Sequence, residues 1–354
     1  MCVIFKAIFA LLFAAALSSV AQALPMKEGN AILKDFTFRS GEKLAEVRIH
    51  YTTLGTPHRN AKGEIDNAVM VLHGTGGSGK QFLQPQFAGE LYGSGQPLDI
   101  TRWYVILPDN LGHGASSKPS DGMKMAFPKY DYDDMVETQR RMFVEGLKIT
   151  KLKLIFGTSM GCMHAFVWGE THPDFAERLA AFACLPVEIA GRNRMWRKMA
   201  IDGIKADPAW NDGNYSVQPA MGIRNAVNLI ILASANPLAL QQQFPTRAEA
   251  EANLDASFAR MVKDCDANDL IYQLDASRSY NPWSRLEEIT ARMLWINSAD
   301  DFINPPGYGI TEAAIKRLKS VTFILISATG ETKGHGTHTW AKFWKNDLAT
   351  LMAK

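Results

Sequence analysis

Short, wholly apolar runs recur along the chain and are separated by longer stretches of mixed polarity. They lie at residues 67–72 (NAVMVL), 103–107 (WYVIL), 152–156, 179–185, 293–296 and 321–326. Runs of this kind, without polar alternation, are typical of strands that are buried on both faces of a sheet. The pattern therefore predicts an α/β fold with a mostly parallel central sheet flanked by helices.

Two further patterns extend the predicted sheet and its cover. Residues 46–51 alternate between polar and apolar side chains, which predicts an edge strand. Apolar residues at helical spacing predict flanking helices over 135–147 and 338–352.

The rhythm of apolar strands stops between residues 187 and 282, where only helical patterns occur, including 192–206 and 247–263. We therefore expect a helical insertion at 187–285 that divides the core into residues 24–186 and 286–354. An insertion over the carboxyl edge of a sheet commonly acts as a lid that excludes water and shapes a substrate pocket. It can also serve as the contact of a homodimer, and the two roles are compatible.

The N-terminus differs in character from the rest of the chain. A start with one positive charge precedes an almost purely apolar run at residues 8–17 and the small-residue pattern Ala21-Gln22-Ala23. This order is typical of a secretory signal peptide. A membrane anchor is the alternative, but the run is short of the roughly 20 residues that a span needs. We predict a signal peptide at 1–23, export to the periplasm or the medium, and no stable membrane insertion after cleavage.

Charge and cysteine content narrow the class of protein. The net charge of +2 over 354 residues argues against a nucleic-acid partner. Removal of residues 1–23 leaves Cys162, Cys184 and Cys265, an odd number without the spacing of a disulfide framework or a metal site. One bridge is possible, but we expect buried thiols.

The candidate chemistry starts at the sequence GTSMG, residues 157–161, which follows an apolar strand and precedes a helical pattern. The pattern G-x-S-x-G in that position is typical of a nucleophile elbow, a sharp turn that presents a serine at the top of a sheet. Glycine suits such a turn because it has no Cβ. We predict that Ser159 is a nucleophile; the alternative is a serine that caps the helix.

A serine nucleophile needs a base, and the base needs an acid that orients it. An elbow of this kind predicts the chain order serine, acid, histidine. Asp300 and Asp301 follow a late strand, and His335 and His338 follow the last one. We favour Asp301 for its spacing to Pro305, and His335 because it lies in a loop, whereas His338 is expected to begin the final helix. The other member of each pair is expected to be a helix cap or a surface residue.

Acyl chemistry at a serine also needs donors for the oxyanion of the tetrahedral intermediate. We expect the backbone N–H of Met160, directly after the nucleophile, and that of Thr75, in the glycine-rich turn after the strand at 67–72. The alternative, a phosphate-binding loop, lacks the required spacing.

The remaining histidines show no metal-ligand spacing, so we expect no metal and no bound cofactor. His113 precedes the serine, which is the wrong order for the base, and is expected to order its own loop. The others are His50, His58, His73, His164 and His172.

These motifs together resemble those of α/β-hydrolases and, more narrowly, the homoserine O-acetyltransferase (MetX-like) branch. The resemblance is carried by YTTLGTPHRNAKGEIDNAVMVLHGTGG, by GTSMGCMHAFVWGETHPDFAERL, by RNRMWRKMAIDGIKADPAWNDGNY, and by DDFINPP and GHGTHTW. It implies an α/β-hydrolase fold with a helical lid, transfer of an acyl group through an acyl-serine, no bound metal and dimerisation through the lid.

The chain departs from this branch near the predicted site. Gly336 stands where the transferases carry an aspartate associated with the amino group of homoserine, and Thr158 and Cys162 stand where glycines are usual. Acetyl-CoA is also not expected in an exported compartment, whereas water is always present. We therefore expect hydrolysis of a carboxylic ester first, acyl transfer to an alcohol second and a non-catalytic binding protein third. Packing is the expected role of the insertion aromatics Trp196, Trp210, Phe244 and Phe258.

Overall fold

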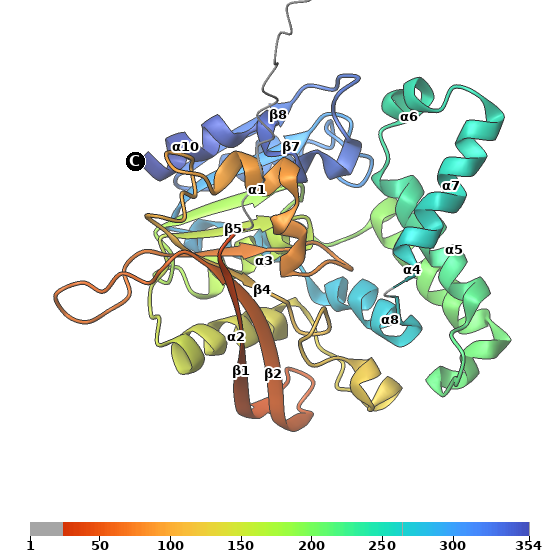
Figure 1. The fold of residues 1–354 in the computed structure, drawn as a ribbon, viewed down its shortest axis with the longest axis horizontal. Helices are drawn as coiled ribbons and strands as arrows, with labels where there is room; N and C mark the ends of the chain where they lie inside the picture. Colours follow the sequence, from red (N-terminus) through yellow and green to blue (C-terminus); the bar gives the residue numbers. More distant parts are fainter. Residues whose placement is uncertain (1–23, 264, 354) are drawn as a thin grey trace, which may run out of the picture.

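The computed structural model describes residues 24–263 and 265–353, so the predicted signal peptide lies outside the described residues. Its strands are β1 (Met26–Thr37), β2 (Lys43–Leu54), β3 (Ala68–Leu72), β4 (Tyr104–Pro108), β5 (Leu154–Thr158), β6 (Arg178–Phe182), β7 (Arg292–Ser298) and β8 (Val321–Ile326). They form one sheet in the order β1-β2-β4-β3-β5-β6-β7-β8 (Figure 1). The pairs β1–β2 and β2–β4 are antiparallel, and the later neighbours are parallel. The predicted mostly parallel sheet is confirmed.

Ten α-helices cover this sheet or extend beyond it in the described part of the chain. They are α1 (Pro85–Leu91), α2 (Tyr132–Arg141), α3 (Met160–Thr171), α4 (Gly191–Ala206), α5 (Ala220–Ser234), α6 (Pro237–Gln243), α7 (Arg247–Met261), α8 (Ala267–Asp275), α9 (Ile310–Ile315) and α10 (Lys345–Ala353). A π-helix, η4 (Met142–Leu147), continues α2 over the remainder of the helix predicted at 135–147.

The central strands are buried on both faces, as their wholly apolar sequences predict. Successive side chains of a strand point to opposite faces, and in β3 Met70 and Leu72 join one core while Val69 and Val71 join the other. Helices α2 and α3 pack on the first core, and α1 and α10 pack on the second. This double cover leaves the strand ends as the places where polar groups can gather.

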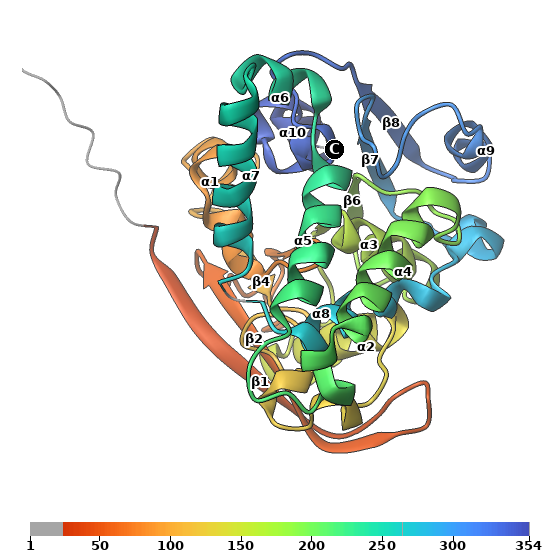
Figure 2. The same ribbon diagram turned by 90° about the vertical axis from the view of Figure 1, so that its right-hand side faces the viewer.

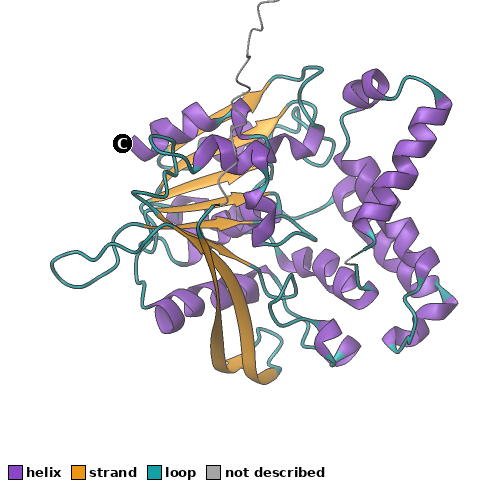
Figure 3. Cartoon of the chain, viewed as in Figure 1, coloured by secondary structure: helices purple, strands orange, loops and turns teal. Residues whose placement is uncertain are grey.

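Helices α4 to α8 occupy the interval between β6 and β7; they lie to the right of the sheet in Figure 1 and face the viewer in Figure 2. Only helices and loops are drawn in this interval in Figure 3, in agreement with the predicted helical insertion. Most of its buried apolar side chains form a separate cluster that includes Ile204, Trp210 and Leu274. Among the described residues no single helix is long and apolar enough to cross a bilayer; α5 and α6 pass that test only together, and they are bent by 100° at their break.

Two predicted elements, one strand and one helix, are wrong in detail. The strand predicted at 46–51 is not at the edge, because β1 pairs along its outer side. Sequence reasoning missed β1, whose side chains are exposed at most positions and give it no continuous apolar run. The helix predicted at 338–352 begins only at Lys345, since residues 334–343 form two 3₁₀ turns, η8 (Gly334–Thr339) and η9 (Ala341–Phe343).

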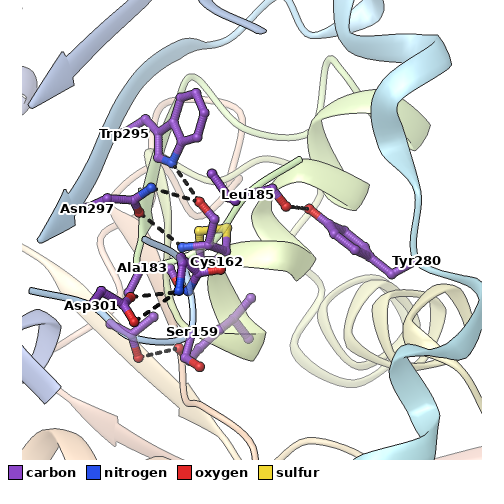
Figure 4. Close-up of a disulfide and its surroundings, with 12 residues drawn as sticks. Ser159, Cys162, Ala183, Leu185, Tyr280, Trp295, Asn297 and Asp301 are labelled. Carbon is purple, nitrogen blue, oxygen red and sulfur yellow. Dashed lines mark hydrogen bonds between the residues drawn. A yellow bond between two sulfur atoms is a disulfide. The ribbon is translucent and has the colours of Figure 1, made fainter. Parts of the chain in front are cut away.

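The prediction that the cysteines are unpaired thiols is also wrong. Cys162 and Cys184 are buried as expected, but they form a disulfide with a Cα–Cα distance of 5.9 Å (Figure 4). Cys162 lies in the first turn of α3 and Cys184 just after β6, and the packing of α3 against the sheet brings them together. Cys265 is a free thiol.

Glu170, near the end of α3, is buried, and its pKa provides a test of how α3 packs. Burial, and to a smaller extent Asp133 and Glu288, raise the pKa of Glu170 to about 7 against the opposing charge of Arg285. A raised pKa in the folded state means that the contribution of Glu170 to stability is complete below its unfolded pKa and is lost as the pH rises through 7.

We expect Glu170→Gln to remove this loss, because glutamine has no charge to desolvate. Relative to the unchanged protein, the variant gains about 1 kcal/mol of unfolding free energy between pH 5 and pH 8, a value reduced for partial solvent screening. Urea denaturation at both pH values measures it. Equal pH dependence in the two proteins would contradict the prediction.

Candidate active site

Ser159 lies in a sharp turn between β5 and α3, with φ 54° and ψ −112°. This positive φ is rare for a residue with a side chain and carries a cost in free energy. A Cβ at position 157 would lie 1.9 Å from the carbonyl oxygen of Gly161, and one at position 161 would lie 2.2 Å from that of Leu72. Only glycine fits at both positions, so the motif is explained by the close approach of helix and strand.

Ser159, His335 and Asp301 form a continuous chain of hydrogen bonds. The Oγ of Ser159 lies 2.8 Å from Nε2 of His335, and Nδ1 of His335 lies 2.8 Å from Oδ2 of Asp301. The three residues follow β5, β8 and β7, which all end at the same edge of the sheet. Parallel strands thus bring together residues that are 176 positions apart in the chain.

The carboxylate of Asp301 is held on both oxygens. Oδ1 accepts hydrogen bonds from the N–H groups of Ile303 (2.7 Å) and Asn304 (3.1 Å), and Oδ2 accepts one from the Asn304 side chain (3.2 Å). Burial acts to raise the pKa of Asp301. The charge of His335 and the hydrogen bonds from His335 and Asn304 outweigh burial, so the pKa of Asp301 is lowered. The group is therefore an anion that can orient the imidazole and stabilise its positive charge.

Asp300 and His338, the less favoured candidates for the acid and the base, lie beside these hydrogen bonds and have other partners. Oδ2 of Asp300 accepts hydrogen bonds from Asn236, Thr332 and the N–H of Gly334. Asp300 therefore organises the loop of His335; it is half-buried and caps none of the described helices. His338 is in η8, and its Nδ1 donates to the carbonyl oxygen of His335. Burial and the neighbouring His335 lower the pKa of His338 to about 3, so it is neutral.

The predicted oxyanion donors flank Ser159. Gly74 is so close that a Cβ there would lie 3.2 Å from the Cβ of Ser159, and Thr75 is the next residue. In the part of the chain that the structure describes, the N–H groups of Thr75 and Met160 donate to no protein acceptor. Both remain free for a ligand, and the oxyanion hole stays a prediction.

Sequence reasoning missed a buried polar cluster next to this loop. The guanidinium of Arg197, from α4, and the hydroxyl of Thr75 lie around the hydroxyl of Tyr132, from α2. Arg197 is 2% exposed and has no carboxylate within salt-bridge distance among the described residues. Its Nε donates to Asn193, but its Nη1 and the hydroxyls of Tyr132 and Thr75 have no partner in hydrogen-bonding geometry.

An unpaired buried charge is costly, so this cluster suits an anionic ligand. Burial lowers the pKa of Arg197, but arginine keeps its charge in proteins. The one signal of this cluster in the sequence is the position of Arg197 within RNRMWRKMAIDGIK, a segment that resembles the homoserine O-acetyltransferase branch.

Two cavities border the site. One of about 200 Å³ is lined by Met163, one helical turn after Ser159, and by Asn193 and Asn304. The other, of about 520 Å³, lies between the loop of Thr75 and the insertion, where Gln273 contributes to its wall. The site therefore has space next to the loop that contains Asp301 and Asn304 and next to the loop that contains Thr75.

The remaining candidates lie where packing accounts for them. His113 is buried, and its Nδ1 bonds to Leu111 of its own loop, in agreement with the expected loop-ordering role. Trp210 packs in the insertion and donates to Asn268, and Trp196 and Phe258 pack against the same cluster. Phe244 lines an apolar hollow in the insertion. No group of three His, Cys, Asp or Glu residues in the described ranges has a metal-binding arrangement.

Most of the chain is similar to known proteins. A family model described as alpha/beta hydrolase fold matches residues 67–332. A homoserine O-acetyltransferase of Solidesulfovibrio magneticus is 30% identical over 304 residues, which cover 80% of this chain and 73% of that protein.

Solved structures share the fold at lower identity. Homoserine O-acetyltransferase from Bacillus anthracis aligns with a TM-score of 0.82 at 20% identity, over 93% of this chain and 98% of that chain. Esterase E22 aligns with a TM-score of 0.80 at 21% identity, over 93% of this chain and 100% of that chain. The predicted fold class is confirmed, and the same fold carries both activities.

The choice between the two aspartates can be tested by a matched pair of variants. In Asp301→Asn an amide donor faces the Nδ1 of His335, so the histidine must take the tautomer that cannot accept the proton of Ser159. We expect kcat for p-nitrophenyl acetate to fall by about 10⁴-fold, as for the equivalent change in serine proteases.

Asp300→Asn is the control, because its amide oxygen can keep the three donors while its nitrogen faces the Ser298 hydroxyl. We expect a loss of at most about tenfold. Equal losses in the two variants would mean that Asp301 is not the acid of this site.

Proposed function

Because the chain belongs to the α/β-hydrolase family, in its homoserine O-acetyltransferase-like branch, we propose that it transfers an acyl group to an alcohol through an acyl-Ser159 intermediate. The observation that carries this proposal is the hydrogen-bonded chain from Ser159 through His335 to Asp301 at a strained turn. The relative of 30% identity supports transfer over simple hydrolysis, which reverses the order expected from the sequence.

In the first half of the reaction, Oγ of Ser159 attacks the carbonyl carbon of the acyl donor while Nε2 of His335 accepts the hydroxyl proton. The N–H groups of Met160 and Thr75 stabilise the negative oxygen of the tetrahedral intermediate. Asp301 stabilises the imidazolium that forms. His335 then gives its proton to the leaving group, and the acyl-serine remains.

In the second half the acceptor alcohol takes the place of the leaving group. His335 removes the proton of the alcohol, and the alcohol oxygen attacks the acyl carbon by the same route in reverse. The tetrahedral intermediate collapses with release of the new ester, and the proton returns to Ser159. Transfer needs room for two organic molecules near one serine, and the cavities lined by Met163 and Asn304 and by Thr75 support it.

The buried charge of Arg197 supports an acceptor or donor that carries a carboxylate. A carboxylate that reaches Nη1 of Arg197 and the hydroxyl of Tyr132 gains charge-assisted hydrogen bonds and removes an unpaired buried charge. Because these groups lie beside Thr75, such a molecule would have its reactive end near the serine.

The residue after His335 distinguishes this site from an amino-acid site. Gly336 provides no carboxylate for an ammonium group. We therefore propose a hydroxy acid in place of an amino acid as acceptor. A Cβ at Gly336 would meet only the Cβ of Lys333, at 3.6 Å, so the position tolerates a side chain.

Hydrolysis of a carboxylic ester is the second candidate. It needs the same serine chemistry with water as acceptor, and Gly336 favours it because the usual amino-group contact is absent. Free acid is then the product in place of a new ester.

Export and self-association are further proposals. The Cys162–Cys184 disulfide supports export, because disulfides persist mainly in oxidising compartments; the N-terminal sequence of the mature protein tests it. Exposed apolar side chains on α5, α6 and α7 support a homodimer through the insertion: Met221, Leu232, Leu238 and Leu254. Analytical ultracentrifugation tests the dimer.

Three acceptors of similar length separate these possibilities, with p-nitrophenyl acetate as donor and products read by mass spectrometry. They are 4-hydroxybutanoate, with a carboxylate only, homoserine, with a carboxylate and an ammonium group, and 1-butanol, with neither. We expect acetyl transfer to 4-hydroxybutanoate in preference to the other two. Arg197→Met should reduce this preference over 1-butanol by at least about tenfold, and Gly336→Asp should shift it toward homoserine.

Ser159→Ala is the control and should abolish every product. Free acetate alone, whichever acceptor is present, would overturn transfer and favour hydrolysis. An unchanged preference in Arg197→Met would remove the carboxylate from the proposal. Failure of a fluorophosphonate to label Ser159 in the unchanged protein would favour a non-catalytic protein.

A further inference from the structure

The disulfide joins two segments that both contact the proposed catalytic residues. Cys162 follows Ser159 by three positions in the first turn of α3. Cys184 ends the short segment 182–184, which leaves the carboxyl end of β6. Figure 4 shows the bridge within the group of residues that includes Ser159 and Asp301.

Segment 182–184 touches the nucleophile at one end and the acid at the other. The N–H of Ser159 donates to the carbonyl oxygen of Phe182 (2.8 Å). The carbonyl oxygen of Ala183 accepts a hydrogen bond from Nδ2 of Asn304 (3.0 Å), and the same Nδ2 donates to Oδ2 of Asp301 (3.2 Å). Asn304 thus links the segment to the oxygen that faces His335.

The segment also holds an unfavourable backbone conformation. Ala183 has φ 67°, in the left-handed region that residues with a Cβ rarely adopt. Such a conformation persists only where the surroundings enforce it. Asn297 and Trp295 of β7 bind the N–H and carbonyl of Cys184 on one side, and the disulfide anchors the same residue to α3 on the other.

We propose that the Cys162–Cys184 disulfide and Asn304 act as one positioning unit for Asp301. The disulfide fixes segment 182–184, the carbonyl of Ala183 fixes the amide of Asn304, and Asn304 holds the carboxylate toward His335. The cysteines are positioning residues for the serine chemistry, and the inference rests on the proposed function. A dithiol reagent reduces the bridge by giving two electrons and two protons. The products are two cysteine thiols and the cyclic disulfide of the reagent.

The test is a mutant cycle measured at 25 °C, well below the melting temperature of each variant. It compares the unchanged protein, the double variant Cys162→Ala/Cys184→Ala, Asn304→Ala, and the combination of all three. The readouts are kcat and KM for p-nitrophenyl acetate and the rate constant for labelling of Ser159 by a fluorophosphonate. Each readout needs the serine and its base but no particular acceptor.

We expect the double variant and Asn304→Ala each to lower kcat and the labelling rate about tenfold with KM nearly unchanged. The combined variant should be no slower than Asn304→Ala alone, because both changes act through the same contact. Leu33→Ala, in β1 at the far edge of the sheet, is a matched control that lowers the melting temperature without changing kcat.

A double variant with a lower melting temperature but full kcat would overturn the proposal and leave the disulfide a structural bridge. Multiplicative losses in the combined variant would also overturn it, since the two contacts would then act independently. Failure of the unchanged protein to react with the fluorophosphonate would instead overturn the proposed function, so the two failures are distinct.

Discussion

The close approach of α3 to β3 and β5 at Ser159 is the constraint on which the rest of the site depends. Gly157 and Gly161 allow it, because a Cβ at either position would overlap a backbone atom. The approach places Ser159 at the carboxyl edge of the sheet with a backbone conformation that a serine does not adopt freely. It also brings the first turn of α3 against the segment after β6, where the disulfide forms.

The sheet then supplies the geometry that the turn alone lacks. Asp301 and His335 follow β7 and β8, which are neighbours in the sheet, and their loops meet above the end of β5. The two loops are bound to each other and to the insertion, because Asp300 accepts hydrogen bonds from Thr332 and from Asn236 at the start of α6. The position of the insertion and the position of the base are therefore linked through one carboxylate.

The features that separate this chain from the branch that it resembles lie close to the serine. Cys162 and Gly336 replace residues that are usual there, and each changes a different property of the site: the first adds a covalent link and the second removes a charge. Arg197 provides a buried positive charge beside Tyr132 and Thr75. Gly336 and Arg197 together support the proposed acceptor, a molecule with a carboxylate for Arg197 and no ammonium group, because no carboxylate follows His335.

The sequence by itself determined the elements whose signal is local. Apolar runs predicted six of the eight strands and an alternating pattern predicted a seventh, because burial on one or two faces is a property of short segments. The glycines around Ser159 predicted the turn, because they lack a Cβ. The order serine, acid, histidine narrowed the acid to Asp300 or Asp301 and the base to His335 or His338, and the spacing to Pro305 and the loop position favoured Asp301 and His335. The sequence patterns could not reveal β1, whose exposed side chains leave no apolar run, or the late start of α10. Only the tertiary structure decided that Cys162 meets Cys184, that Asp300 binds the loop of His335, and that Arg197 is buried with no carboxylate partner among the described residues. Each depends on segments that are distant in the chain and meet only after the sheet and the insertion have packed.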